Sequence, residues 1–140
     1  MYRTALSALA LSTFLSFSPQ LDAQQVGPSN GSLVIVGGAM SDTGIIEHFL
    51  DLAGGPDASI VVIPTAGGDD EYDQFYQGLN SWRDVGATHL TVLHTKDRAE
   101  ANSDAFVKAI REANGVWFPG GRQWRLADSY LGTKTEEELW

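Results

Sequence analysis

Four short apolar runs, rich in β-branched residues, recur along the sequence and constrain its fold more than any other feature. Runs of this length without polar alternation are typical of strands buried on both faces of a sheet. They are LVIVGG (Leu33–Gly38), SIVVIPTA (Ser59–Ala66), HLTVLHT (His89–Thr95) and GVWFPGG (Gly115–Gly121). We therefore expect four strands of a parallel sheet.

Segments with helical periodicity separate these predicted strands and cover residues 45–53, 72–85 and 106–113. Asp42 or Thr43 can cap the first helix, and Gly54 follows its end. Gly86 stops the second helix, and Ser103 can cap the third. The alternation predicts an α/β fold, a parallel sheet with helices on both faces.

The first 23 residues have the features of a secretory signal peptide. Arg3 precedes an apolar stretch over residues 5–17, and the small residue Ala23 follows. That stretch is shorter than the roughly 20 apolar residues of a membrane-spanning helix. We expect cleavage near Ala23 and a secreted or periplasmic protein, with a polar connection over 24–31 and one domain over 32–140.

The end of the sequence predicts an unfinished fold. Residues 126–131 predict a fourth helix that stops at Gly132. Thr135 and the glutamates after it form a capping box that opens a fifth helix, which Leu139 and Trp140 barely extend. We interpret the sequence as truncated before the next strand, so that the fold is incomplete at its C-terminus.

Composition excludes several classes of function. A chain without cysteine has no disulfide and no thiolate metal site. A net charge of -9 without a basic patch argues against nucleic acid and anionic membranes as partners, although it would attract a cationic substrate. Gly37–Gly44 matches neither a dinucleotide fingerprint nor a P-loop, and we expect no cofactor and no metal.

The candidate site lies at the carboxyl ends of the predicted strands, where open parallel sheets bind ligands. His94 is the one histidine at such an end, and a lone histidine there is usually a supporting or surface residue. The acidic residues over 69–73 are explained as carboxylates at a helix N-terminus, where the dipole favours each by roughly 0.3 to 1 kcal/mol.

Pro119-Gly120-Gly121 forms the most suggestive of these strand ends. Two adjacent glycines allow a sharp turn and leave N–H groups unobstructed, which suits an oxyanion or carboxylate position. A plain strand-to-helix turn with packing glycines explains the pair equally well. We expect Arg122 to face solvent.

Four segments, taken in order, resemble the cyanophycinase and aspartyl dipeptidase family of serine peptidases, with cyanophycinase the nearer match. They are LVIVGGAM, LAGGPDASIVVIPTAGG, TKDRAEAN and GVWFPGGRQWRLADSYLGT. The resemblance covers residues 32–139, and its most specific piece is Gly-Gly-x-Gln-x-x-Leu over 120–126. It implies a flavodoxin-like, three-layer fold similar to class I glutamine amidotransferases, and peptide-bond hydrolysis by a serine nucleophile with a histidine and an acid.

The resemblance also implies roles for residues of this chain. The turn at Gly120 and Gly121 would lie beside the nucleophile, and the N–H of Gly121 would be an oxyanion donor. Gln123 would line the substrate pocket, and Gly37 and Gly38 would form part of its floor.

The catalytic residues themselves are not expected in this sequence. In the family, the serine lies in a Gly-x-Ser-Ala-Gly elbow on the strand after the helix predicted here at Thr135, and no Gly-x-Ser-Ala-Gly occurs in the chain. We expect an inactive N-terminal portion of a hydrolase. The implied substrates are cyanophycin, an aspartate backbone carrying arginine side chains, and other Asp-containing peptides. Homo-oligomers are implied in the same way.

A different class of function is open as well. A non-catalytic α/β module could bind a small ligand or peptide at the same strand ends without hydrolysing it.

Overall fold

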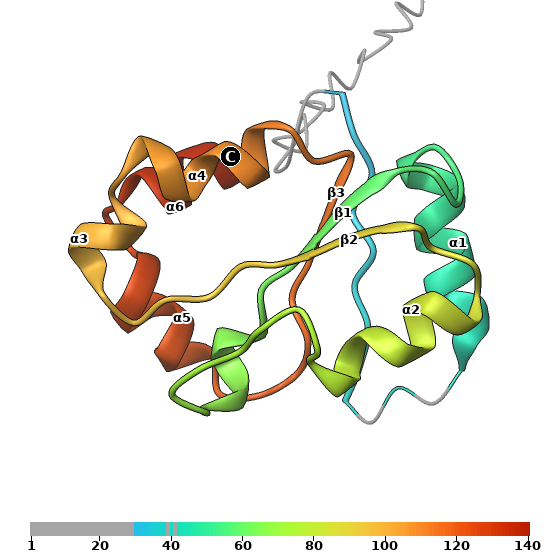
Figure 1. The fold of residues 1–140 in the computed structure, drawn as a ribbon, viewed down its shortest axis with the longest axis horizontal. Coiled ribbons are helices and arrows are strands. Elements are labelled where there is room, and N and C mark those ends of the chain that lie inside the picture. The colour runs from blue at the N-terminus through green and yellow to red at the C-terminus, as the bar shows by residue number, and fades with distance from the viewer. Residues whose placement is uncertain (1–29, 39, 41) are drawn as a thin grey trace, which may run out of the picture.

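A computed structural model describes residues 30–38, 40 and 42–140 of the chain (Figure 1). The predicted signal peptide, its cleavage position and most of the polar connection lie outside the described residues. Within the described ranges, no helix is both long and apolar enough to cross a membrane.

Three strands form a parallel sheet in the order β2-β1-β3. They are β1 (Ser59–Val62), β2 (His89–Val92) and β3 (Gly115–Trp117). Val61 of β1 pairs with Thr91 of β2 and with Val116 of β3. The predicted α/β class and three of the four predicted strands are confirmed.

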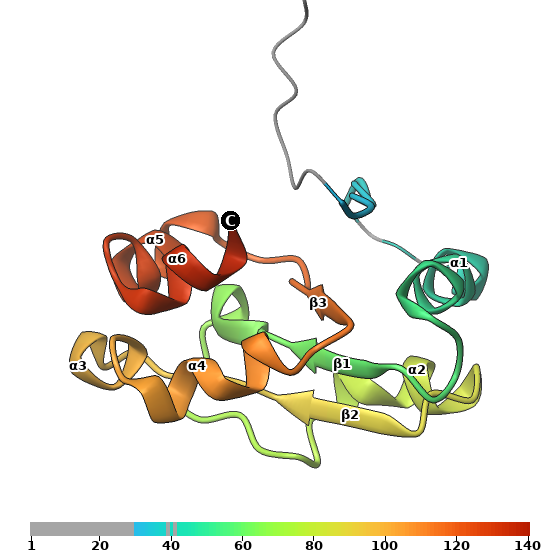
Figure 2. The same cartoon turned by 90° about the horizontal axis from the view of Figure 1, so that it is seen from above.

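Helices cover both faces of this sheet, as Figures 1 and 2 show. The first face carries α1 (Thr43–Ala53) and α2 (Asn80–Asp84), and the other carries α3 (Arg98–Ala101), α4 (Asp104–Arg111), α5 (Gln123–Tyr130) and α6 (Lys134–Leu139). Two 3-10 turns, η1 (Pro64–Gly67) and η2 (Gln77–Leu79), follow β1 and precede α2.

Each face of the sheet has its own hydrophobic cluster, because successive side chains of a strand point to opposite faces. Ile60 and Val62 of β1 belong to the cluster that contains Trp82 of α2. Val61 belongs to the second cluster, with Val107 of α4. Burial of each large apolar side chain contributes about 1.5 to 3 kcal/mol, so the two clusters hold both helical layers on the sheet.

Local capping signals mark several helix ends correctly. Asp42 Oδ1 accepts the N–H of Gly44 over 2.8 Å at the start of α1, and Gly54 ends this helix with a φ of +115°. Ser103 Oγ accepts the N–H of Phe106 over 3.2 Å at the start of α4. These three predictions are confirmed.

Leu33–Gly38 is not a strand, contrary to the prediction from its apolar pattern. Leu33 and Ile35 are 72% and 85% exposed. An apolar run becomes a strand only where the edge of another strand can pair with it, and β3 pairs only with β1 among the described residues.

The predicted long helix over 72–85 is also wrong. Only η2 and the short helix α2 form there, and the acidic segment before them is irregular. Asp73 Oδ1 accepts the N–H of Phe75 over 2.8 Å, which is a side-chain turn that competes with helix formation. The acidic residues therefore do not lie at a helix N-terminus, and the dipole explanation fails.

The last helix begins two positions earlier than the predicted capping box implies. Thr133, not Thr135, is the N-cap of α6, and Glu136 Oε2 accepts the N–H of Gly132 over 2.6 Å. Thr135 is buried, and its hydroxyl donates to the carbonyl of Ala101 over 2.7 Å. Tertiary contact with α3 decides the orientation of Thr135.

Candidate functional site

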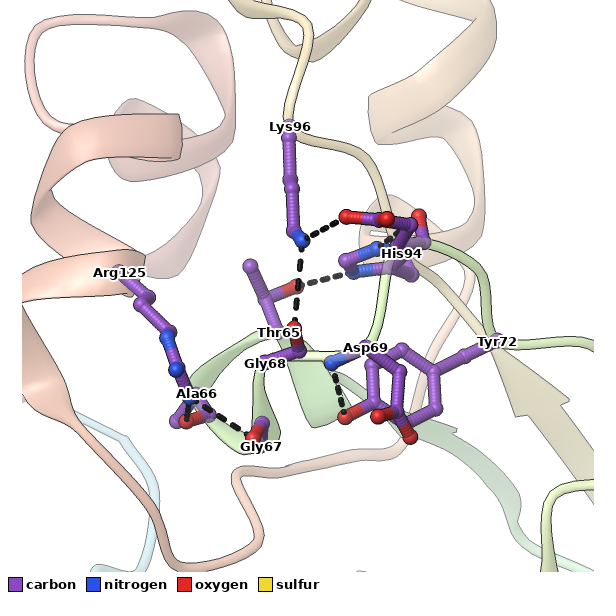
Figure 3. A network of polar contacts seen from close by, with 10 residues as sticks. Thr65, Ala66, Gly67, Gly68, Asp69, Tyr72, His94, Lys96 and Arg125 are labelled. Atoms are coloured by element: carbon purple, nitrogen blue, oxygen red, sulfur yellow. Dashed lines mark hydrogen bonds and ion pairs between the residues drawn. The ribbon is translucent and has the colours of Figure 1, made fainter.

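The turn that follows β3 lies against η1, the turn that follows β1. The N–H of Arg122 donates to the carbonyl oxygen of Ala66 over 2.9 Å. The guanidinium of Arg125 donates from Nη1 to the same oxygen over 3.1 Å and to that of Gly67 over 2.7 Å (Figure 3). Three hydrogen bonds thus fasten two strand ends together at the carboxyl edge of the sheet.

Gly121 is required by this close approach. Its φ is +153°, and a β-carbon there would collide with the backbone carbonyl of Ala66. Gly120 has open space in the same position. Within the described part of the chain, the N–H of Arg122 is paired, whereas the N–H groups of Gly120 and Gly121 have no partner. Packing thus explains Gly121, and the unpaired N–H groups are what an oxyanion position needs.

Gln123 is the first residue of α5 and is exposed. Arg122 precedes it as the N-cap and makes no side-chain capping bond. The Arg122 guanidinium lies 5.0 Å from the centre of the Trp124 ring. The expected exposure of Arg122 is confirmed, and the predicted contact of Gln123 with substrate stays a prediction.

A buried network joins the ends of β1 and β2 to α5. The hydroxyl of Thr65 lies 2.8 Å from Nδ1 of His94 and 2.6 Å from the hydroxyl of Tyr130. The Tyr130 oxygen also accepts the N–H of Thr95 over 3.3 Å. Thr65 is fully buried, so these bonds satisfy groups that water cannot reach.

The donor and acceptor of each hydrogen bond in this network follow from the groups at its two ends, the carbonyl of Asp70 and the N–H of Thr95. The carbonyl of Asp70 can only accept, so Nε2 of His94, 3.2 Å away, carries the proton. A neutral imidazole then accepts at Nδ1 from the Thr65 hydroxyl, which in turn accepts from the Tyr130 hydroxyl. The N–H of Thr95 completes the chain, which is therefore fully satisfied only while His94 is neutral.

Burial lowers the pKa of His94, and the hydrogen bond to the Asp70 carbonyl opposes this shift in part. The ring of Tyr72 meets the imidazole edge-on, with 4.9 Å between the ring centres. The same neutral form is thus favoured by burial and by the direction of the hydrogen bonds.

His94 faces a cavity of about 700 Å³ beyond the end of β2. Its lining includes five carboxylates, one ammonium group, three aromatic rings and His94 itself. These residues are Asp69, Asp70, Glu71, Asp73, Glu100, Lys96, Tyr72, Phe75, Tyr76 and His94. Lys96 Nζ pairs with Asp70 over 2.8 Å and donates to the carbonyl of Gly68 over 3.4 Å (Figure 3). That bond holds the pKa of the Asp70 carboxyl below its usual value, and the cavity as a whole is negative.

The predicted site residues lie on two segments of the chain. Gly121 and Gln123 lie at the start of α5 beside η1. Gly37 and Gly38 lie in the segment 30–38, where they are exposed and their α-carbons have open space. No group of three or more His, Asp or Glu side chains in the described ranges could hold a metal ion.

Two residues that organise this edge of the sheet were not predicted from the sequence. Arg125 holds the carbonyls of η1, and Tyr130 anchors Thr65. Both lie in the stretch after β3 that resembles the peptidase family. No sequence pattern indicated the role of either residue, because a local pattern does not identify a hydrogen-bond partner about 60 residues away.

Comparison with known proteins gives one consistent result. No protein-family model matches the chain. It is 28% identical over 130 residues to the cyanophycinases of Synechococcus elongatus and Thermosynechococcus vestitus, which covers 85% of this chain. It is 27% identical over 113 residues to that of Geminocystis herdmanii, which covers 77% of this chain. The chain spans about 40% of the length of the curated relatives it matches. Over most of its length, the chain is therefore similar to cyanophycinases.

Proposed function

We propose that this chain is the N-terminal portion of an exported serine-type peptidase that hydrolyses cyanophycin or other Asp-containing peptides. Similarity to three cyanophycinases over most of the chain supports the substrate class. The structural observation that carries the proposal is the turn at Gly120 and Gly121. It is pinned to η1 at the carboxyl edge of the sheet, and within the described residues its N–H groups have no partner.

In this proposal, the N–H of Gly121 stabilises the oxyanion that forms when a serine attacks the peptide carbonyl. One such donor contributes about 3 to 4 kcal/mol to transition-state stabilisation, provided that its position is preorganised. The bonds from Arg122 and Arg125 to Ala66 supply that preorganisation. The serine, the histidine and the acid come from residues after Trp140 in a longer protein.

The acidic cavity beside His94 supports an arginine-bearing substrate. Five carboxylates surround one Lys96, so a guanidinium group is attracted to the cavity. Phe75 lines it and is 85% exposed, which leaves its ring free to stack on a planar cation. Such a contact contributes about 0.5 to 1 kcal/mol at an exposed site.

The test is an assay of the longer protein, obtained by reading its coding sequence beyond Trp140. We expect an in-frame Gly-x-Ser-Ala-Gly segment and release of Asp-Arg dipeptide from cyanophycin, with loss of activity when that serine becomes alanine. The 140-residue chain alone should release nothing. A stop codon directly after Trp140 would refute catalysis by this protein. Cleavage of acidic dipeptides without release of Asp-Arg from cyanophycin would instead indicate an aspartyl dipeptidase.

A binding module is the second candidate, because the cavity beside His94 is formed wholly by described residues of this chain. Binding of Asp-Arg dipeptide to the chain, measured by calorimetry, together with a longer protein that does not hydrolyse it, would favour this function.

A further inference from the structure

A groove of about 810 Å³ runs along the side of β3 that faces away from β1. One side of it is β3, and the other is formed by residues of the segment 30–36. Apolar residues of both helical layers form its walls, and the last three residues of the chain line it as well. These residues are Phe49, Leu52, Ala53, Ile110, Ala113, Glu138, Leu139 and Trp140.

The edge of β3 presents unpaired backbone groups to this groove. The carbonyl of Trp117 accepts the N–H of Ile63 over 2.9 Å, so the polar groups of Trp117 face β1. In a parallel strand, the N–H and C=O of the preceding residue face the opposite side. Those of Val116 therefore point into the groove, and they bond to none of the residues that the structure describes.

At the opposite edge of the sheet, a side chain pairs with one residue of β2. Gln74 Oε1 accepts the N–H of Val92 over 3.0 Å, and Gln74 Nε2 donates to the carbonyl of Val92 over 3.0 Å. The amide of Gln74 thus takes the place that a neighbouring strand would take. Among the described residues, the outer edge of β2 is paired at Val92, and the outer edge of β3 is unpaired at Val116.

The far side of the groove is also an unpaired, apolar segment. Residues 30–38 run in the same direction as β3 (Figure 1) and belong to no ladder. Leu33 and Ile35 are largely exposed. Within the described part of the chain, neither this segment nor the Val116 edge of β3 has a backbone partner across the groove, and most of the residues that line it are apolar.

We propose that this groove receives one further parallel strand, supplied by the polypeptide that follows α6 in the longer protein. Trp140 lines the groove, as does Gly115, the first residue of β3. Polypeptide that leaves α6 near Gly115 starts at the amino end of β3 and can run parallel to β3. A parallel strand at that place is what a crossover connection through α5 and α6 requires. The strand is apolar on both faces, pairs with Val116 on one side and orders Leu33–Gly38 on the other.

The inference rests on the proposed function for the source of the strand, because the relatives are about two and a half times as long as the part that this chain spans. Its test does not depend on catalysis. The 140-residue chain is mixed with the part of the Synechococcus elongatus cyanophycinase that is C-terminal to its matched region. Size-exclusion chromatography follows complex formation, and NMR follows hydrogen exchange of single amides.

We expect a 1:1 complex in which exchange of the Val116 amide slows at least 100-fold. Val116→Pro removes the donor that faces the groove and leaves the ladder to β1 intact, since proline is tolerated on an open edge. It should weaken the complex at least tenfold. Val116→Ala keeps the donor and serves as the matched control, with a change below threefold.

Three outcomes would overturn the inference: no complex, equal effects of the two substitutions, or protection of Val116 that appears in the chain alone and grows with its concentration. The last result would make a second copy of the chain the occupant. Protection of Val116 in a complex that leaves cyanophycin intact would support the inference and count against the peptidase.

Discussion

The N–H of Arg122 donates a 2.9 Å hydrogen bond to the carbonyl oxygen of Ala66, and this bond joins the ends of two neighbouring parallel strands. It holds the turn at Gly120 and Gly121 in one position. Because a preorganised turn is what oxyanion stabilisation needs, the stability of this junction and the proposed activity depend on the same residues.

Gly121→Ala should destabilise the chain by about 1 to 3 kcal/mol, because a β-carbon would meet the Ala66 carbonyl and a positive φ would be forced on alanine. Gly120→Ala is the matched control, since open space surrounds that position. It should change stability by less than about 0.5 kcal/mol. Urea unfolding measures both. Equal effects would mean that Gly121 does not approach Ala66 in solution.

Arg125→Ala should cost about 1 to 3 kcal/mol, because it removes charged donors from the carbonyls of Ala66 and Gly67. Arg122→Ala should cost less than about 1 kcal/mol, because the exposed guanidinium lies over the Trp124 ring, its one partner among the described residues, and the backbone bond of residue 122 to Ala66 is kept. Thermal unfolding of the two variants measures both losses of stability, and the loss should be larger for Arg125→Ala. A larger loss in Arg122→Ala would contradict this assignment.

Thr65→Val should destabilise the chain by about 1 to 3 kcal/mol, because Tyr130 and His94 would lose a partner in a buried site. Thr91→Val serves as the control at an exposed position of β2 and should be close to neutral. Denaturant midpoints give both values. A neutral Thr65→Val would show that the network contributes nothing to folding.

Lowering the pH should reduce the free energy of unfolding of the chain, because His94 becomes protonated. Its pKa in the folded state lies below 6.5 because of burial, so the unfolded state takes up the proton more readily. The contribution is therefore fully present above pH 6.5 and is lost as the pH falls through the lowered folded-state value. Urea midpoints at pH 7, 6 and 5 should decline more steeply in the native chain than in His94→Asn.

The matching NMR experiment follows the imidazole signals of His94 with pH. A midpoint above 6.5 would contradict a neutral His94 that accepts from Thr65. It would also reverse the expected dependence of stability on pH.

Much of the fold could be predicted from the sequence. The runs that contain Val61, Thr91 and Val116 became strands, because continuous apolar, β-branched stretches have few other ways to bury themselves. Asp42, Gly54 and Ser103 mark helix ends through bonds or dihedral angles that involve near neighbours. The glycine pair after β3 left two explanations equally open, an oxyanion position and packing, and the structure shows that Gly121 packs against Ala66.

Other features were decided by tertiary structure alone. Leu33–Gly38 has the composition of a strand but no partner edge, and Asp73 and Gln74 make bonds that replace a helix. The meeting of Thr65, His94 and Tyr130 brings together residues far apart in sequence. Periodicity and capping depend on neighbours within a turn or two, so the sequence determines them. Strand order, edge closure and buried hydrogen bonds depend on which distant groups come within about 3 Å, and only the folded chain decides that.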